Sequence, residues 1–127
     1  MTNDILHDIP IEYRDKFRVF LAEDPIETSV LKHQMDQYLE TVRLLAPLVK
    51  AFSLTTMEQL GQNGLELLAT ADGDEQRALA QAVVRYLVEE EQDDEITGVL
   101  GLDDDVAICN AVCRGFGRHD MLIKSSR

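Results

Sequence analysis

The chain has 127 residues, 45% of them apolar, and 24 acidic against 12 basic side chains give it a formal net charge of −12. This length fits one domain with an ordinary hydrophobic core, so neither a metal nor a disulfide is needed to stabilise it. The negative charge repels nucleic acid and anionic lipid, which disfavours direct binding to DNA or RNA.

The first ten residues lack a basic region followed by an apolar run, and no stretch of 18 apolar residues occurs. A secretory signal has the first pattern and a transmembrane helix has the second. We therefore expect a soluble, cytoplasmic protein without a transmembrane segment.

The first expected helix spans Pro10 to Leu21, where aromatic and aliphatic side chains alternate with basic ones. A second helix should begin at Asp24 and Pro25, because an N-cap acid, a proline at the first helical position and Glu27 form a capping box. Apolar residues then recur every three or four positions to about residue 51, although Pro47 should kink or end this helix near residue 46.

Two more capping boxes follow, at residues 55–58 and 72–75, and each precedes a run of regularly spaced apolar residues. A last helix should be capped by Asp103 or Asp104. Cys109 and Cys113 lie four residues apart and share one face of this helix, where we expect small core residues. Their Cα separation of about 6 Å would also permit a disulfide.

No segment has the alternation of a strand, and the connections between the long helices are short, which favours antiparallel neighbours. The predicted fold class is therefore all-α, a single compact irregular bundle of five or six helices. The bundle should form one domain over residues 1–127, with flexible ends at about 1–9 and 118–127.

Nine carboxylates and no Lys or Arg occupy residues 89–105, which we call the acidic segment. The acids at 103–105 suit a helix N-terminus, where they accept unpaired N–H groups. Those at 89–91 lie near the end of the preceding helix, where negative charge is unfavourable. Folding alone does not require them, although a solvated acidic loop remains one interpretation.

The functional interpretation is a docking surface for a basic protein, as in immunity proteins, antitoxins or nucleic-acid mimics. Dense like charge speeds association with a cationic partner and weakens as salt rises. The predicted partner-binding residues are Glu89, Glu90, Glu91, Asp93, Asp94, Glu95, Asp104 and Asp105.

Enzymatic function is not expected, because the chain shows no nucleophile–base pair and no phosphate-binding glycine loop. No cofactor and no metal site are predicted. Weak binding of a divalent cation to the acidic segment is an alternative, but the segment lacks the ligand spacing of a helix-loop-helix calcium site. Zinc bound by Cys109, Cys113 and His119 would need a fourth ligand.

Basic residues gather toward both ends of the chain. They could pair with the acidic segment of the same chain, or with that of a second copy, so a homodimer is a further alternative. These residues are Arg14, Lys16, Arg18, Arg114, Arg118, Lys124 and Arg127.

Three short motifs, at residues 86–88 (YLV), 99–101 (VLG) and 104–108 (DDVAI), resemble the core signature of the YkvA-like family. In that family a helix ending in a Tyr-Leu pair leads through an acidic turn and a Leu-Gly step to an Asp-Asp pair that opens the next helix. The resemblance covers about residues 74–114 and carries over to Gly101, Asp104 and Asp105. It implies a helical bacterial domain with a structural or membrane-peripheral role as the alternative function.

Overall fold

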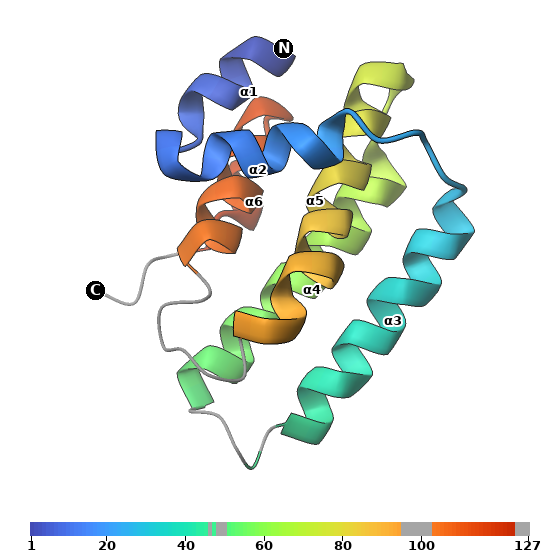
Figure 1. Cartoon of the computed structure of the whole chain (residues 1–127), viewed down its shortest axis with the longest axis vertical. Coiled ribbons are helices and arrows are strands. Elements are labelled where there is room, and N and C mark those ends of the chain that lie inside the picture. The colour runs from blue at the N-terminus through green and yellow to red at the C-terminus, as the bar shows by residue number, and fades with distance from the viewer. Residues whose placement is uncertain (46, 48–50, 95–102, 124–127) are drawn as a thin grey trace.

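The computed structural model describes residues 1–45, 47, 51–94 and 103–123, and of residues 45, 51–53 and 89–94 it describes the backbone alone. Over these residues the chain forms six α-helices and a short 3-10 helix, with no strand (Figure 1). This confirms the predicted all-α bundle. The helices are α1 (Thr2–Asp8), α2 (Ile11–Leu21), α3 (Thr28–Leu45), α4 (Ala51–Thr70), α5 (Gly73–Asp94), α6 (Asp103–Gly115) and the 3-10 helix η2 (His119–Met121).

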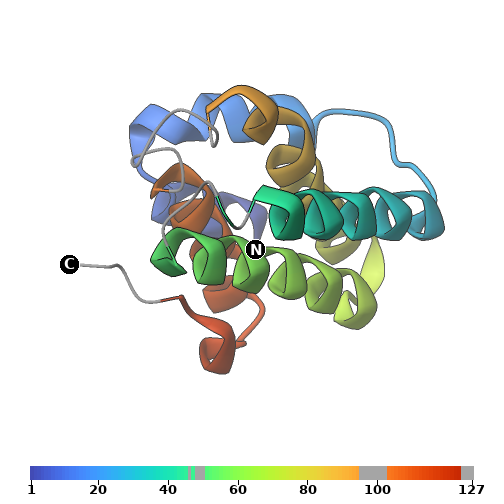
Figure 2. The same cartoon turned by 90° about the horizontal axis from the view of Figure 1, so that it is seen from below.

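Helices α3, α4 and α5 run alternately down, up and down, so consecutive helices are antiparallel (Figure 1). Seen from below, α3 and α4 lie side by side (Figure 2). Helix α2 crosses α5 and α6, and α1 packs against α6. The antiparallel arrangement agrees with the short connections noted in the sequence.

Helix α5 is the centre of the bundle, because it contacts α2, α3, α4 and α6. A helix with neighbours on most sides must be apolar around most of its circumference. Its middle is buried without a break from residue 82 to residue 87. Small residues there let neighbouring helices approach, and large ones fill the space between them. The buried apolar residues of α5 are Leu79, Ala80, Ala82, Val83, Val84, Tyr86 and Leu87.

The predicted start of α5 is correct, and its cap differs in detail. Gly73 adopts a φ of 82°, a conformation that glycine takes without steric cost. The N–H of Asp72 donates to Oε1 of Gln76 over 2.8 Å, which closes the turn. Glu75, the expected capping acid, instead accepts a hydrogen bond from the hydroxyl of Thr2 over 2.8 Å.

Helix α3 begins at Thr28, so the predicted start at Asp24 is wrong. Side chains of α5 hold the preceding residues in a non-helical conformation. Arg85 donates to the carbonyl of Asp24 over 2.7 Å. Gln81 accepts from the N–H of Ile26 and donates to its carbonyl, over 3.3 and 2.8 Å. These long-range hydrogen bonds occupy the carbonyls of Asp24 and Ile26 and the N–H of Ile26. A helix that starts at Asp24 would use the same backbone groups for its first hydrogen bonds and its cap.

Helix α4 begins at Ala51, so the capping box at residues 55–58 lies inside the helix. No proline or glycine separates residue 51 from the box, and helix propagation gains one hydrogen bond for each residue added. The end of α3 at Leu45 agrees with the helix-ending effect expected of Pro47.

Both ends of the described chain are packed against the bundle. Residues 2–8 form α1, and Ile5, Leu6 and Ile9 are buried. Near the other end, Met121 and Ile123 are buried, while residues 124–127 lie outside the described residues. The structure thus places core residues within both predicted flexible ends, and their mobility stays a prediction.

Candidate functional site: the acidic segment and the α5–α6 junction

The first half of the acidic segment belongs to α5, which continues through Asp94. The backbone of residues 89–94 is therefore helical, and no basic residue lies in the last turn. A negative charge in the last turns of a helix is unfavourable by roughly 0.3–1 kcal/mol, because the C-terminal end of the macrodipole is negative. Five predicted partner-binding residues, Glu89, Glu90, Glu91, Asp93 and Asp94, occupy these turns, and Glu95 lies outside the described residues.

The second half of the segment opens α6, where Asp103, Asp104 and Asp105 form the first turn. Here the helix macrodipole favours negative charge. Their exposure falls in order along the chain: Asp103 is exposed, Asp104 is half-buried and Asp105 is buried. The three acids therefore have different surroundings, although they are adjacent in sequence.

Asp104 ties α5 to α6. The hydroxyl of Tyr86 donates to its Oδ2 over 2.7 Å, and the N–H of Asp105 donates to its Oδ1 over 3.0 Å. The Tyr86 side chain is fixed in turn by burial and by an edge-on contact with Phe20, with ring centroids 5.5 Å apart. Tyr86 and Asp104 directly flank residues 87–103 in the chain. Their hydrogen bond therefore holds the two ends of this stretch close together, at what we call the α5–α6 junction.

Asp105 faces the interior and is only 3% exposed. It lines a cavity of about 10 Å³ with Tyr86, Cys109 and neighbouring apolar side chains, a space for about one water molecule. A partner at the surface cannot reach this carboxylate, so Asp105 leaves the set of candidate contact residues. The sequence contained the signal, because Asp105 shares a helix face with Ile108 and Cys109, three and four residues on.

The negative field of the α6 start extends to α2. Partial burial raises the pKa of Tyr13, and the charges of Glu12, Asp104 and Asp103 raise it further. Carboxylates disfavour a nearby phenolate because like charges repel. Asp103 and Asp104 at the start of α6 therefore act together with Glu12 of α2 on the Tyr13 hydroxyl.

Several basic residues near the chain ends have partners outside the acidic segment. Arg114 binds Asp8 over 2.6 Å, and Arg18 binds Asp15 over 3.3 Å. Arg14 donates to the carbonyl of Ile9 over 2.9 Å. Among the expected cationic residues, Lys124 and Arg127 lie outside the described residues.

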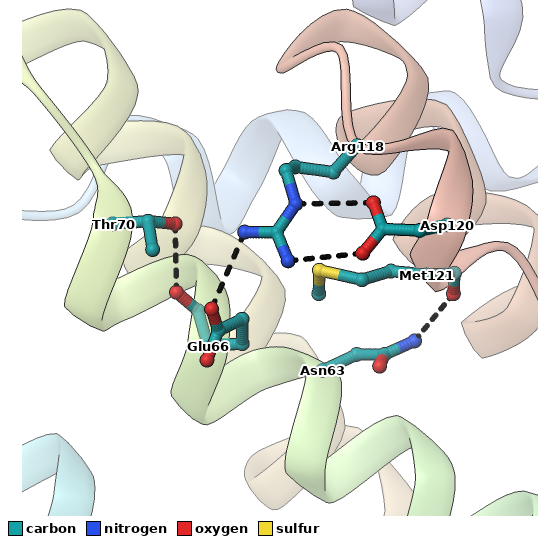
Figure 3. Close-up of polar contacts among 6 residues, drawn as sticks. All are labelled: Asn63, Glu66, Thr70, Arg118, Asp120 and Met121. Atoms are coloured by element: carbon teal, nitrogen blue, oxygen red, sulfur yellow. Dashed lines mark hydrogen bonds and ion pairs between the residues drawn. The ribbon is translucent and has the colours of Figure 1, made fainter.

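A second polar cluster holds residues 118–123, which we call the C-terminal strap, against α4 and α6. The guanidinium of Arg118 binds both carboxylate oxygens of Asp120 and reaches Glu66 over 3.3 Å (Figure 3). Asn63 donates to the carbonyl of Met121 over 2.8 Å, also drawn in Figure 3.

Asn110 binds the strap at a further position. Its side chain accepts from the N–H of Ile123 over 2.9 Å and donates to the Ile123 carbonyl over 2.8 Å. None of the expectations drawn from the sequence included this cluster. Its signal was an asparagine in the interior of α4 and of α6, Asn63 and Asn110, because asparagine is a poor helix former and a buried amide needs partners.

Within the ranges that the structure describes, no three or more His, Cys, Asp or Glu side chains are grouped so as to hold a metal ion. Those ranges do not include the side chains of residues 89–95. In the same part of the chain, no helix is both long enough and apolar enough to span a membrane.

No protein-family model, curated protein or solved structure matches this chain. The interpretation of the site therefore rests on the residues and contacts of the chain itself. Those contacts make the α5–α6 junction a structural anchor, and the acids at 89–94 and Asp103 lie in the chain between its two members, Tyr86 and Asp104.

Proposed function

We propose that this protein acts through protein–protein interaction, by presenting the acids of the segment to a basic protein partner. The observation that carries the proposal is the charge of the segment: residues 89–105 hold nine carboxylates and no Lys or Arg. Elsewhere in the described chain, Arg18, Arg77, Arg85, Arg114 and Arg118 form ion pairs with other acids. These five cations are engaged away from the segment, which supports a segment whose charge attracts an external partner.

The anchoring of the segment adds a second argument. The hydrogen bond from Tyr86 to Asp104 fixes the first turn of α6 against α5, about two turns before α5 ends at Asp94. A charged surface whose supports are fixed before binding loses less conformational entropy when a partner docks. The negative end of the α5 macrodipole, at Asp94, lies within the acidic segment and adds to the attraction for a cation.

The proposed interaction is electrostatic, so its strength has a clear dependence on salt. An exposed ion pair contributes roughly 0.2–1 kcal/mol, and five or six such pairs contribute a few kcal/mol together. Screening acts over about 8 Å at physiological ionic strength. We expect fast association that weakens steeply as NaCl is added.

Affinity capture tests the proposal. The wild-type chain, immobilised and exposed to a lysate of its source cells at low salt, should retain a basic protein that high salt releases. A segment-neutral variant should lose that protein. This variant carries Glu89→Gln, Glu90→Gln, Glu91→Gln, Asp93→Asn and Asp94→Asn.

A surface-matched variant provides the control. It neutralises five exposed acids elsewhere and so has the same net charge as the segment-neutral variant: Asp4→Asn, Glu27→Gln, Asp36→Asn, Glu40→Gln and Asp72→Asn. We expect it to retain the basic protein. Equal loss from both variants would show that net charge alone is responsible, and equal retention by all three proteins would remove the segment from the interface.

The second candidate is a YkvA-like helical domain with a structural or membrane-peripheral role, in which the acidic segment is merely solvated. The observation that favours it is Leu44, whose side chain is 75% exposed at the end of α3. Sedimentation with neutral phosphatidylcholine vesicles tests this candidate. Binding that Leu44→Ser abolishes would support it, and a chain that stays in the supernatant would contradict it.

A further inference from the structure

Two thiols lie in the core at the base of the C-terminal strap. Cys109 and Cys113, one turn apart on α6, are both free, and they are 1% and 0% exposed. Their side chains hydrogen-bond to each other. The strap begins beside them, because the N–H of Arg118 donates to the carbonyl of Cys113 over 2.8 Å. Asn63 links the thiol pair to the strap, since it hydrogen-bonds to the Cys109 thiol and to the carbonyl of Met121.

The two thiols are not equivalent. The hydrogen bond with Cys113 and burial raise the pKa of Cys109 well above its ordinary value. The same hydrogen bond lowers the pKa of Cys113, and the positive charges of Arg118 and Arg114 favour its thiolate despite burial. A thiolate is the nucleophile in thiol–disulfide exchange. These surroundings favour Cys113 as the attacking sulfur and Cys109 as the thiol that resolves the product.

We propose that Cys109 and Cys113 form a reversible redox pair, which a low-molecular-weight disulfide such as glutathione disulfide oxidises to an intrahelical disulfide when the strap opens. The Cys113 thiolate attacks one sulfur of glutathione disulfide, and the other glutathione leaves as a thiolate. Cys109 then loses its proton, attacks the Cys113 sulfur and expels the second glutathione. The protein loses two protons and two electrons, and glutathione disulfide gains them and is reduced to two glutathione thiols.

Helix geometry explains why the oxidised form should be easily reduced. Side chains four residues apart on a helix have Cβ atoms about 5–6 Å apart. A disulfide requires a Cβ separation of about 3.5–4.5 Å. The bond can form only if this turn of α6 tightens, and a strained disulfide has a higher reduction potential than a relaxed one.

The strap controls access to the thiols. Its buried side chains, Met121 and Ile123, close over the α4–α6 surface, and the amide of Asn110 holds Ile123 by two hydrogen bonds. Gly117, with a φ of 75°, precedes the strap and can act as its hinge. Local opening of a short segment requires less free energy than global unfolding, so reagents should reach Cys113 in the folded protein.

Mass spectrometry of the full-length protein after incubation with glutathione disulfide tests the proposal. Wild type should lose the mass of two hydrogens without keeping an adduct, and dithiothreitol should restore the mass. Cys109→Ser should keep one glutathione on Cys113, because no second thiol can resolve it. Wild type that keeps both thiols, or that accumulates a stable glutathione adduct, would overturn the redox pair, and this arm requires no variant to fold.

Rates of oxidation test the order of attack and the role of the strap. Cys113→Ser should react more slowly than Cys109→Ser, and equal rates would contradict Cys113 as the nucleophile. Asn110→Ala removes two strap hydrogen bonds without changing either thiol, so wild-type thiols in this background should oxidise about tenfold faster. The control Thr41→Val loses a hydrogen bond on α3, away from the strap, and should react at the wild-type rate. An unchanged rate for Asn110→Ala would show that the strap does not control access.

Discussion

At the scale of single residues, Arg85 is a charged side chain within the core. It is 6% exposed, and its guanidinium binds Glu23 over 2.9 Å and the Asp24 carbonyl over 2.7 Å. A buried charge is tolerated only where such partners satisfy it. Arg85 therefore stabilises the connection between α2 and α3 as well as the interior of α5.

Replacement of Arg85 by alanine should lower the free energy of unfolding by about 2–4 kcal/mol, because it leaves a space in the core and removes both partners' hydrogen bonds. Urea unfolding measures this change. Arg77 is the control, since its ion pair with Asp74 is exposed on both sides, and Arg77→Ala should change stability by at most about 0.5 kcal/mol. Equal effects of the two variants would contradict the structural role of Arg85.

Glu75 provides a prediction on pH dependence. Hydrogen bonds from the hydroxyl and the N–H of Thr2 lower the pKa of Glu75. A carboxyl whose pKa is lower in the folded chain stabilises the fold above its unfolded-state pKa, and this contribution is lost as pH falls through the folded pKa.

Thr2→Val should therefore raise the pKa of Glu75 toward its ordinary value, which NMR titration of the carboxyl measures. The variant should be less stable than wild type near neutral pH, and the difference should vanish once Glu75 is protonated in both proteins. A stability difference that stays constant into acid would mean that Thr2 acts through packing and not through this carboxyl.

At the scale of elements, the hydrogen bond from Tyr86 to Asp104 joins α5 to α6 at the base of the acidic segment. Tyr86→Phe removes it and leaves the half-buried Asp104 with one partner fewer. We expect a loss of about 1–3 kcal/mol in the free energy of unfolding, and faster hydrogen exchange in α6 than in α4.

Asp104→Asn is the informative companion variant, because the amide oxygen can still accept from Tyr86. It should lose less stability than Tyr86→Phe if the hydrogen bond matters more than the charge. A Tyr86→Phe protein as stable as wild type would show that the hydrogen bond does not fix the junction.

The sequence was sufficient for features that depend on local chemistry. Apolar periodicity predicted helical structure, Pro47 marked the end of α3, and the acids at 103–105 marked the start of α6. The sequence was insufficient for features that depend on contacts between side chains far apart in the chain. Arg85 and Gln81 shift the start of α3, and Asn63 holds a strap 58 residues away in the chain.

The candidate site was predictable to the same extent. The charge density of the segment is visible in the sequence, and so is the helical phase that turns Asp105 inward, although that signal was not used. The role of Asp104 depends on Tyr86, 18 residues earlier, and no local pattern indicates that hydrogen bond.

At the scale of the whole molecule, the excess of acids gives the chain a field that extends beyond any single residue. Five of the described arginines pair with acids of α1, α2, the α2–α3 connection, α4, α5 and the strap, while the acidic segment spans the end of α5 and the start of α6. We therefore expect the attraction for a cationic partner to be concentrated at that junction and not spread over the surface.

The central claim is that the acidic segment, and not net charge in general, guides a basic partner to this protein. The most direct measurement is the association rate constant of the captured partner with wild type, the segment-neutral variant and the surface-matched variant over a range of NaCl. We predict that the segment-neutral variant associates about tenfold more slowly at low salt and depends less on salt, while the surface-matched variant stays close to wild type. Equal slowing of both variants, or no slowing of either, would contradict the claim.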